Sequence, residues 1–267
     1  MIALIAGTGA LPGILARALV AAGDPPVICE MAGFAPDILP DFPRLHFRIE
    51  TLGTLLQTLK TQGITRICMA GAMRRPVFDR TAIDPLTAPL VPRLTAAMAL
   101  GDDGTLRGIV ALLEECGFVI VGAEQIAPEL LPQVGMPTRL KPLKSHELDS
   151  MTGIAEIAKM GRADTGQACV VADGTVRDRE DSAGTDALLV RVRLSARTSG
   201  LAVLVKAPKP GQDRRVDLPV IGPSTARLAA AAGLAGIVIQ AGGVMVLDLP
   251  QVVQVLDDHG LFLWVRR

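Results

Sequence analysis

The sequence predicts an α/β protein with two domains: a Rossmann-like domain built on a parallel sheet, followed by a separate α+β domain. Short apolar runs alternate with helical segments through the first half, a proline-rich stretch interrupts this pattern, and a hairpin signal follows it. With 267 residues and an apolar fraction of 49%, the chain is long and apolar enough to bury a substantial core.

Five short apolar runs in the first half are expected to form strands. They cover residues 2–6, 27–31, 45–49, 66–71 and 118–122. Helices are expected between them over 11–22, over 51–61, where leucines recur at helical spacing, and from about Asp103 onward. Unbroken apolar strands that alternate with helices are typical of a parallel sheet covered on both faces.

A boundary between domains is expected where three prolines and a glycine gather, in the segment 127–138. This gives an N-terminal domain over 1–127, a linker over 128–138 and a C-terminal domain over 139–267. In the latter, Asp173-Gly174 between two apolar runs predicts a hairpin. Further strands are expected at 201–205 and 236–240, and helices at 150–159, 225–232 and 251–258, while 187–194 fits either a strand or a helix.

The composition excludes several classes of protein. Lys+Arg and Asp+Glu balance at 27 each and only 3% of residues are aromatic, which argues against a nucleic-acid-binding protein. The cysteines lie far apart, each in or beside an apolar run, and are expected to be buried reduced thiols rather than zinc ligands. They are Cys29, Cys68, Cys116 and Cys169.

The sequence pattern indicates neither a signal peptide nor a membrane-spanning helix. The first residues have no basic region before the apolar run, which reaches a glycine too early for a signal peptide. No apolar stretch approaches the roughly 20 residues of a membrane-spanning helix. We therefore expect a soluble cytoplasmic protein whose contact with a membrane, if it has one, is peripheral.

The segment 206–217 concentrates charge in a chain that has no net charge. It gathers Lys206, Lys209, Arg214 and Arg215 around Asp213 and Asp217, in a turn stiffened by prolines. Cations bind phosphate, and carboxylates bind divalent metals, so this pattern suits a site that cleaves phosphates. If Arg215 and Asp217 lie in an extended segment, their side chains share a face. A solvated basic loop explains the same charges equally well.

Glycines after the first strand raise a second possibility. Gly7 and Gly9 lie where dinucleotide-binding folds place their glycine motif, and Glu30 ends the second strand, where such folds place an acid that binds ribose. Pro12 stands in place of the third glycine, which argues against a nicotinamide-dependent oxidoreductase. The glycines then serve either a tight turn or the binding of an anion or a sugar hydroxyl.

Two further acidic turns can each be interpreted as a helix cap or as a binding site. Asp102 and Asp103 precede a helix, and so do Thr185 and Asp186. Each pair suits a helix N-cap. Asp102 and Asp103 also suit contact with Mg²⁺ or a sugar hydroxyl, and Thr185 and Asp186 also suit contact with a phosphate or glucosamine group.

Seven segments together resemble the UDP-2,3-diacylglucosamine pyrophosphatase family of the LpxI type, in order and spacing over nearly the full chain. They are 5–12, 71–76, 101–103, 184–186, 205–212, 215–222 and 241–243. The family usually has Glu before the Gly-Thr-Asp motif, where this chain has Ala183, and Glu180 and Asp181 are the candidate substitutes for that acid.

The resemblance implies an enzyme of lipid A biosynthesis in which a Rossmann-like domain and a C-terminal domain bind a glycolipid between them. The implied reaction is Mg²⁺-dependent hydrolysis of UDP-2,3-diacylglucosamine to lipid X and UMP, with Mn²⁺ as a possible substitute. A non-catalytic carrier of glycolipid or nucleotide is the other alternative. Nothing in the sequence locates the acyl pocket or fixes the oligomeric state.

Roles can be assigned to the residues in these motifs on the hydrolase hypothesis. Asp217, Lys206 and Arg215 are the candidate catalytic residues, with Asp217 and Asp186 as the candidate metal ligands. The candidate substrate-binding residues are Gly7, Gly9, Asp102, Asp103, Thr185, Lys209 and Gln212.

Overall fold

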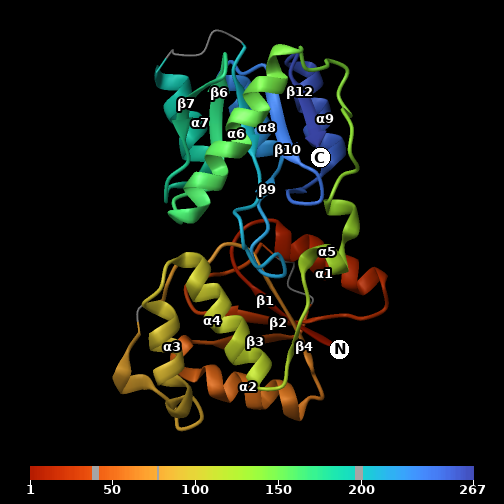
Figure 1. Cartoon of the computed structure of the whole chain (residues 1–267). Helices are drawn as coiled ribbons and strands as arrows, with labels where there is room; N and C mark the ends of the chain where they lie inside the picture. Colours follow the sequence, from red (N-terminus) through yellow and green to blue (C-terminus); the bar gives the residue numbers. More distant parts are fainter. Residues whose placement is uncertain (38–41, 77, 196–200) are drawn as a thin grey trace. The chain divides into compact units, whose positions relative to one another are not determined.

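The structure is a computed structural model that describes residues 1–37, 42–76, 78–195 and 201–267 (Figure 1). It divides into two compact units. Unit 1 consists of residues 1–128 together with 213–217, and unit 2 of residues 129–212 together with 218–267. The chain thus divides after Pro128, and a segment of five residues from its C-terminal half belongs to unit 1.

Unit 1 contains a parallel sheet of five strands, in the order β3-β2-β1-β4-β5. The strands are β1 (Ile2–Ala6), β2 (Val27–Met31), β3 (Arg44–Phe47), β4 (Arg66–Ala70) and β5 (Val119–Ile120). All residues of β1, which is central, are buried, as expected for a strand covered on both faces. Strands β2 and β3 are added on one side of β1, and the chain then crosses to the other side, where it adds β4 and β5. Such a reversal between β1 and β4 is the switch point of doubly wound folds.

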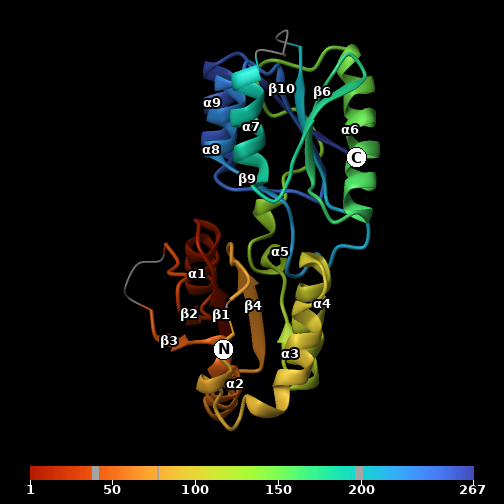
Figure 2. The ribbon, with the colours of Figure 1, turned by 90° about the vertical axis from the view of Figure 1, so that its left-hand side faces the viewer.

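Helices cover both faces of this sheet. They are α1 (Leu11–Ala21), α2 (Leu52–Thr61), α3 (Val91–Met98), α4 (Asp102–Glu115) and the short α5 (Ala123–Ile126), with single 3₁₀ turns at Ile49–Thr51, Arg80–Ala82, Ala88–Leu90 and Pro128–Leu130. Side chains of α2, α3 and α4 form one buried cluster with the sheet, including Leu59, Leu94 and Leu113. Figure 2 shows α1 on the opposite side of the sheet from α3 and α4.

Unit 2 contains a mixed sheet in the order β12-β10-β8-β6-β7. Its strands are β6 (Ala168–Ala172), β7 (Thr175–Arg179), β8 (Val203–Lys206), β10 (Gly236–Gln240) and β12 (Phe262–Arg266). Strands β8, β10 and β12 are parallel, whereas β6 and β7 form the antiparallel hairpin predicted at Asp173-Gly174. Both turn residues have positive φ, 52° and 68°, as a tight hairpin of this kind requires. A separate parallel pair joins β9 (Val220–Ile221) to β11 (Met245–Val246).

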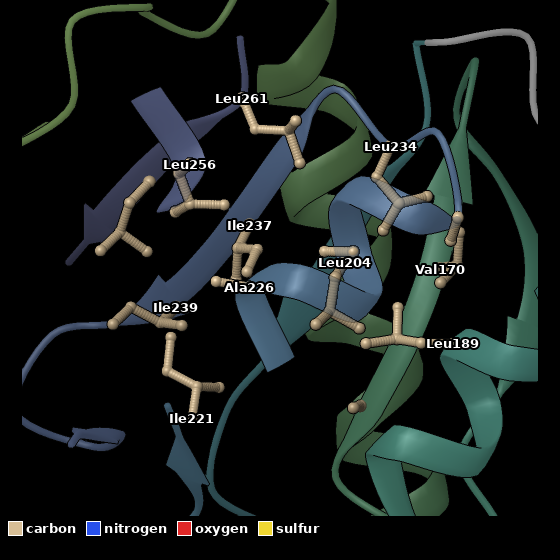
Figure 3. Close-up of a cluster of buried hydrophobic side chains, with 14 of the residues drawn as sticks. Val170, Leu189, Leu204, Ile221, Ala226, Leu234, Ile237, Ile239, Leu256 and Leu261 are labelled. Carbon is tan, nitrogen blue, oxygen red and sulfur yellow. The ribbon is translucent and has the colours of Figure 1, made fainter. Parts of the chain in front are cut away.

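Two hydrophobic layers enclose the sheet of unit 2. The larger lies under α7 (Gly184–Ser195), α8 (Pro223–Ala231) and α9 (Leu249–Asp258) and includes Leu204 of β8 (Figure 3). The other lies under α6 (Ser145–Arg162) and includes the next residue, Val205. Side chains alternate along a strand, so Lys206 falls on the same face as Leu204, beneath α7–α9.

The structure confirms the predicted fold class: a parallel sheet in the N-terminal region and a separate mixed sheet with helices in the C-terminal region. The ambiguous segment 187–194 lies within α7, so its strand-like alternation was misleading. Within the described residues, no helix is both long and apolar enough to cross a membrane.

The loops that follow β1 and β4 are bonded directly to each other. The Gly7 amide donates to the Ala70 carbonyl at 2.8 Å, and Thr8 and Ala72 exchange two backbone bonds of 3.0 Å. At Gly71, which has φ of +91°, a Cβ atom would lie 2.7 Å from the Gly7 backbone. Both the positive φ and the close approach of the two loops require glycine at position 71. The two loops are therefore in direct contact at the switch point between β1 and β4.

We predict that Gly71→Ala destabilises unit 1 more than Gly63→Ala does. Gly63 also has positive φ, +71°, but no atom lies within 4 Å of its added Cβ. The control substitution then carries only the left-handed backbone penalty of about 1–2 kcal/mol, whereas Gly71→Ala adds an overpacking cost of roughly 1–3 kcal/mol. Calorimetry of the full chain checks this, with Trp264 fluorescence reporting unit 2 separately. Equal losses in the two variants would show that the loops separate at little cost.

Candidate functional site

A series of hydrogen-bonded polar residues, most of them buried, lies at the end of β8 in unit 2. The Lys206 ammonium donates to the Thr185 hydroxyl at 2.6 Å, and this hydroxyl donates to a Glu180 carboxylate oxygen at 2.5 Å. The other Glu180 oxygen accepts a hydrogen bond from the backbone amide of Gln167 at 2.6 Å. Lys206, Thr185 and Glu180 are 5, 9 and 7% exposed. A lysine this deeply buried is costly unless its charge is compensated, so the chain of contacts explains how the fold tolerates it.

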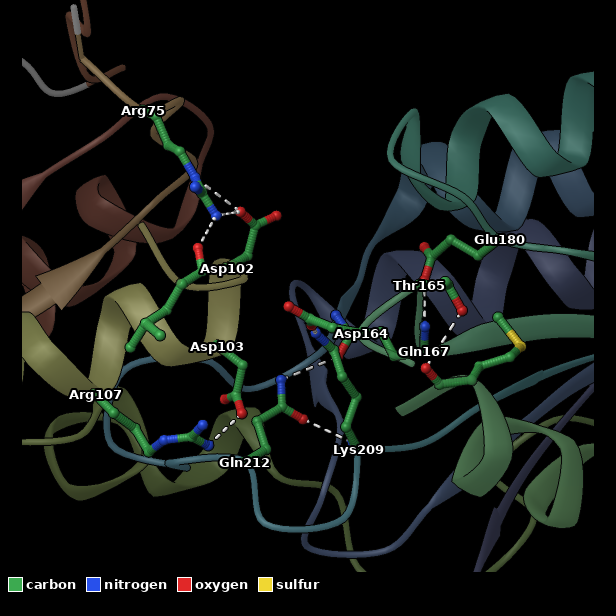
Figure 4. A network of polar contacts seen from close by, with 12 residues as sticks. Arg75, Asp102, Asp103, Arg107, Asp164, Thr165, Gln167, Glu180, Lys209 and Gln212 are labelled. Atoms are coloured by element: carbon green, nitrogen blue, oxygen red, sulfur yellow. Dashed lines mark hydrogen bonds and ion pairs between the residues drawn. The ribbon is translucent and has the colours of Figure 1, made fainter. Parts of the chain in front are cut away.

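The loop after β8 is held by the same network. Lys209 Nζ lies 2.6 Å from a carboxylate oxygen of Asp164, and its backbone amide donates to the Gln212 side chain at 2.8 Å. The Gln212 amide group in turn donates to the Gln167 side chain at 3.1 Å. Figure 4 shows this loop and the Glu180 contact together. Lys206, Thr185, Lys209 and Gln212, all singled out in the sequence, therefore belong to one connected network in unit 2.

Two members of this network, Gln167 and Asp164, were missed by sequence reasoning about the site, and a third, Glu180, was considered only as a substitute for the acid absent at Ala183. Asp164 has a left-handed backbone, φ 51°, just after α6, and Gln167 precedes β6. No motif links them to the segment 206–212, because they reach it only through the folded sheet. Glu180 carried a weak signal, since it lies three residues before Ala183, where the resembling family usually has an acid.

The first turn of α7 holds Thr185 and Asp186 within the helix rather than at its cap. The helix begins at Gly184, and Thr185 directs its hydroxyl to Lys206 and Glu180. Asp186 is exposed, which suits a carboxylate that binds an ion or substrate from solvent. Acidic side chains in a first turn also interact favourably with the helix dipole.

The remaining charged residues of the basic segment belong to unit 1. Asp213–Asp217 forms a turn in which the Asp217 amide donates to the Asp213 carbonyl at 3.1 Å. The turn corrects the extended conformation considered for residues 215–217, so strand alternation does not place Arg215 and Asp217 on one face. Asp217 is partly exposed.

The Arg215 guanidinium is shared between two carboxylates of unit 1. It binds Asp213 through Nε at 3.0 Å and Nη2 at 2.7 Å, and Glu114 through Nη1 at 2.6 Å. The hydrogen bonds to Arg215 lower the pKa of the Asp213 carboxyl. The hydrogen bonds that Arg215 forms, first with Asp213 and second with Glu114 in size of effect, raise the pKa of the Arg215 guanidinium. Arg214, by contrast, is exposed and forms no ion pair within the described residues.

The N-terminal candidates are distributed over separate loops of unit 1. The backbone amide of Gly7 is already bonded to Ala70, whereas Gly9 is exposed, with φ of +94°. Because the amides of Gly7 and Thr8 are bonded to carbonyls, neither is available to a dinucleotide pyrophosphate. Glu30 pairs with Arg44 at 2.8 Å. These contacts give the oxidoreductase alternative no support.

Asp102 and Asp103 open α4 without capping it. The N-cap is Gly101, so the N-cap reading of these two aspartates was wrong. Asp102 accepts from Arg75 Nη2 at 2.7 Å, and Asp103 pairs with Arg107 one turn further along the helix (Figure 4). Asp102 is 82% exposed despite its partner, so it can still meet a ligand from solvent.

Neither thiols nor a preformed metal cluster mark this site. Burial raises the pKa of Cys29, Cys68 and Cys169 to about 12 each, so these thiols stay protonated and are poor nucleophiles. Within 1–37, 42–76, 78–195 and 201–267, no three residues of the types His, Cys, Asp and Glu gather in a way that could hold a metal ion.

Comparison with known proteins gives concordant results over both halves of the chain. The model of the LpxI N-terminal domain matches residues 1–130, and that of the LpxI C-terminal domain matches residues 133–264. A protein of Caulobacter vibrioides described as UDP-2,3-diacylglucosamine pyrophosphatase LpxI is 38% identical over 266 residues. The match covers 97% of this chain and 95% of that protein.

We predict that Thr185→Val destabilises unit 2 by about 1–3 kcal/mol, because the hydroxyl that joins two buried charged groups is lost. Thr175→Val, at an exposed position of β7, is the matched control and should change little. Urea unfolding followed by the fluorescence of Trp264, the only tryptophan, measures both. If the two variants are equally stable, the hydroxyl does not hold the buried network together.

Proposed function

Because the chain belongs to the LpxI family, we propose that it hydrolyses the pyrophosphate bond of UDP-2,3-diacylglucosamine, a cytoplasmic step of lipid A biosynthesis. The observation that carries this proposal is 38% identity, over 97% of the chain, to a protein described as that pyrophosphatase. Water adds to one phosphorus and the bridging oxygen leaves with the other, giving UMP and 2,3-diacylglucosamine 1-phosphate, known as lipid X.

Hydrolysis of an anhydride between two phosphates requires that growing negative charge be neutralised and that a water molecule be oriented. We assign the second task to Asp217, whose carboxylate accepts a proton from water or orients it. We assign the first to Lys206 and Lys209. Lys206 suits this role because its low exposure reduces screening by solvent and its hydrogen bond to Thr185 fixes its position.

Mg²⁺, with Mn²⁺ as a substitute, is the cofactor we propose. Mg²⁺ usually binds through one or two carboxylates, with water and substrate phosphates completing its shell, so it does not need a cluster of three protein ligands. Asp217 and Asp186 are the residues we propose to hold it, and both carboxylates are at least partly exposed. When bound, the ion neutralises charge on the phosphate oxygens.

The protein incubated with UDP-2,3-diacylglucosamine and Mg²⁺ is expected to release UMP and the acylated sugar phosphate in equal amounts. EDTA should stop the reaction, and added Mg²⁺ or Mn²⁺ should restore it. Asp217→Asn should lower kcat by roughly 10²–10³-fold, the scale of losing a positioned base, while the melting temperature is retained. Asp173→Asn, at the exposed hairpin turn, is the control. UMP release by Asp217→Asn at the wild-type rate would remove Asp217 from the mechanism, and full activity in EDTA would remove the metal.

We further propose peripheral contact with the inner membrane through a surface at the start of α6. Leu143, Leu148 and Met151 are 57, 58 and 58% exposed there, and Lys144 is exposed between them. Arg266 donates to the Glu147 carbonyl at 3.3 Å and lies 5.0 Å from the Trp264 ring, which adds a cation and an aromatic ring beside the helix. Exposed apolar side chains among cations suit the surface of an anionic bilayer.

This contact predicts that the protein sediments with vesicles containing phosphatidylglycerol and less with vesicles of phosphatidylcholine alone. Leu148→Gln combined with Met151→Gln should reduce the bound fraction roughly fivefold or more, since two apolar anchors are lost. Leu194→Gln, a more exposed leucine on α7, is the control. If all three proteins bind equally, this surface does not contact the membrane.

A further inference from the structure

The five residues Asp213–Asp217 interrupt unit 2 and belong to unit 1. Gln212 before them and Leu218 after them belong to unit 2, yet these five pack with unit 1. A segment this short cannot bury a core of its own, so its place in unit 1 depends on a few identifiable contacts. Val216 supplies one, because it packs against the buried cluster under α2, α3 and α4.

The segment is first stabilised as a turn. Asp213 accepts from the Arg215 backbone amide at 3.1 Å and from two guanidinium nitrogens, while its carbonyl accepts the amides of Val216 at 3.2 Å and Asp217 at 3.1 Å. A bidentate pair between arginine and carboxylate is directional as well as strong. Arg215 is therefore rigidly oriented before it contacts the rest of unit 1.

The remaining guanidinium nitrogen, Nη1, reaches Glu114 at 2.6 Å. Glu114 and Glu115 end α4, which has no basic residue in its last turn, so both carboxylates face the negative end of the helix dipole. Each is matched by an arginine from elsewhere. Glu115 pairs with Arg93 of α3, also at 2.6 Å, whereas Glu114 pairs with the inserted turn.

We propose that Glu114 is a positioning residue: through Arg215 it fastens the turn 213–217 to α4 and so fixes the position of Asp217 in unit 1. Arg215 was a candidate catalytic residue, but all three of its guanidinium nitrogens bind carboxylates. On this proposal it links Glu114 to the turn and does not bind phosphate. The importance for catalysis rests on the proposed function, but the fastening itself does not.

Hydrogen–deuterium exchange on the full-length chain tests the fastening without substrate. In Glu114→Gln, the amides of Val216 and Asp217 should exchange about two- to fivefold faster, the scale expected for one exposed ion pair. Glu115→Gln is the matched control: it removes the pair at the same helix end that does not involve the turn. It should leave these amides unchanged. Unchanged exchange in Glu114→Gln, or equal acceleration in both variants, would overturn the proposal.

A second variant tests whether Glu114 acts through Arg215. In an Arg215→Gln background, Glu114→Gln should cause no further acceleration, because its partner is already gone. An additional effect of the same size would mean that Glu114 acts by another route and would reject the link.

Activity then separates this inference from the proposed function. If the wild type hydrolyses UDP-2,3-diacylglucosamine, Glu114→Gln should lower kcat by a factor similar to the change in exchange and leave KM nearly constant. Glu115→Gln should change neither kcat nor KM. A change in KM alone would contradict a role in placing Asp217. If the wild type shows no hydrolysis while exchange follows the pattern above, the function fails and the fastening stands.

Discussion

The buried ammonium of Lys206 is the constraint that organises the C-terminal unit. A cation that is 5% exposed must find compensation close by, and one such contact is the Thr185 hydroxyl, which in turn donates to the Glu180 carboxylate. These contacts fix the start of α7 against the end of β8. They continue through Gln167 to the loop that carries Lys209 and Gln212, so one charge-compensating chain also shapes the basic loop. A hydrogen-bonded polar network of this kind is rigid, which suits the electrostatic role proposed for Lys206.

Local patterns were sufficient for most of the architecture. The strand at residues 2–6, the hairpin at Asp173-Gly174 and the helix after Asp102 follow from apolar runs and turn chemistry, which act over a few residues. The strand-like alternation at 187–194 was misleading because the apolar residues Leu188, Leu189 and Val192 also fall on one helical face, and packing against the sheet decided the matter. The sequence also showed that Lys206, Lys209 and Thr185 were unusual, but not that Asp164 and Glu180 are their partners.

What the sequence could not show is that residues 213–217 belong to the N-terminal unit. Neighbouring prolines and cations suggested one continuous basic turn, because a local pattern of charges does not reveal a contact with a helix about a hundred residues earlier in the chain. The distance in sequence between Arg215 and Glu114 is 101 residues. The first of the two compact units runs to Pro128, which lies in the proline-rich segment 127–138.

The division of labour between the units affects how the chemistry is understood. The hydrogen bond between Lys206 and Thr185 lies inside unit 2, and the hydrogen bonds that form the turn carrying Asp217 lie inside unit 1. On the proposed function, Thr185→Val should act first on the position of Lys206, whereas Glu114→Gln should act first on the turn that carries Asp217. The effects of independent sites add, whereas those of coupled sites do not. Kinetics of the double variant therefore measure how far the proposed cation and the proposed carboxylate act together in hydrolysis.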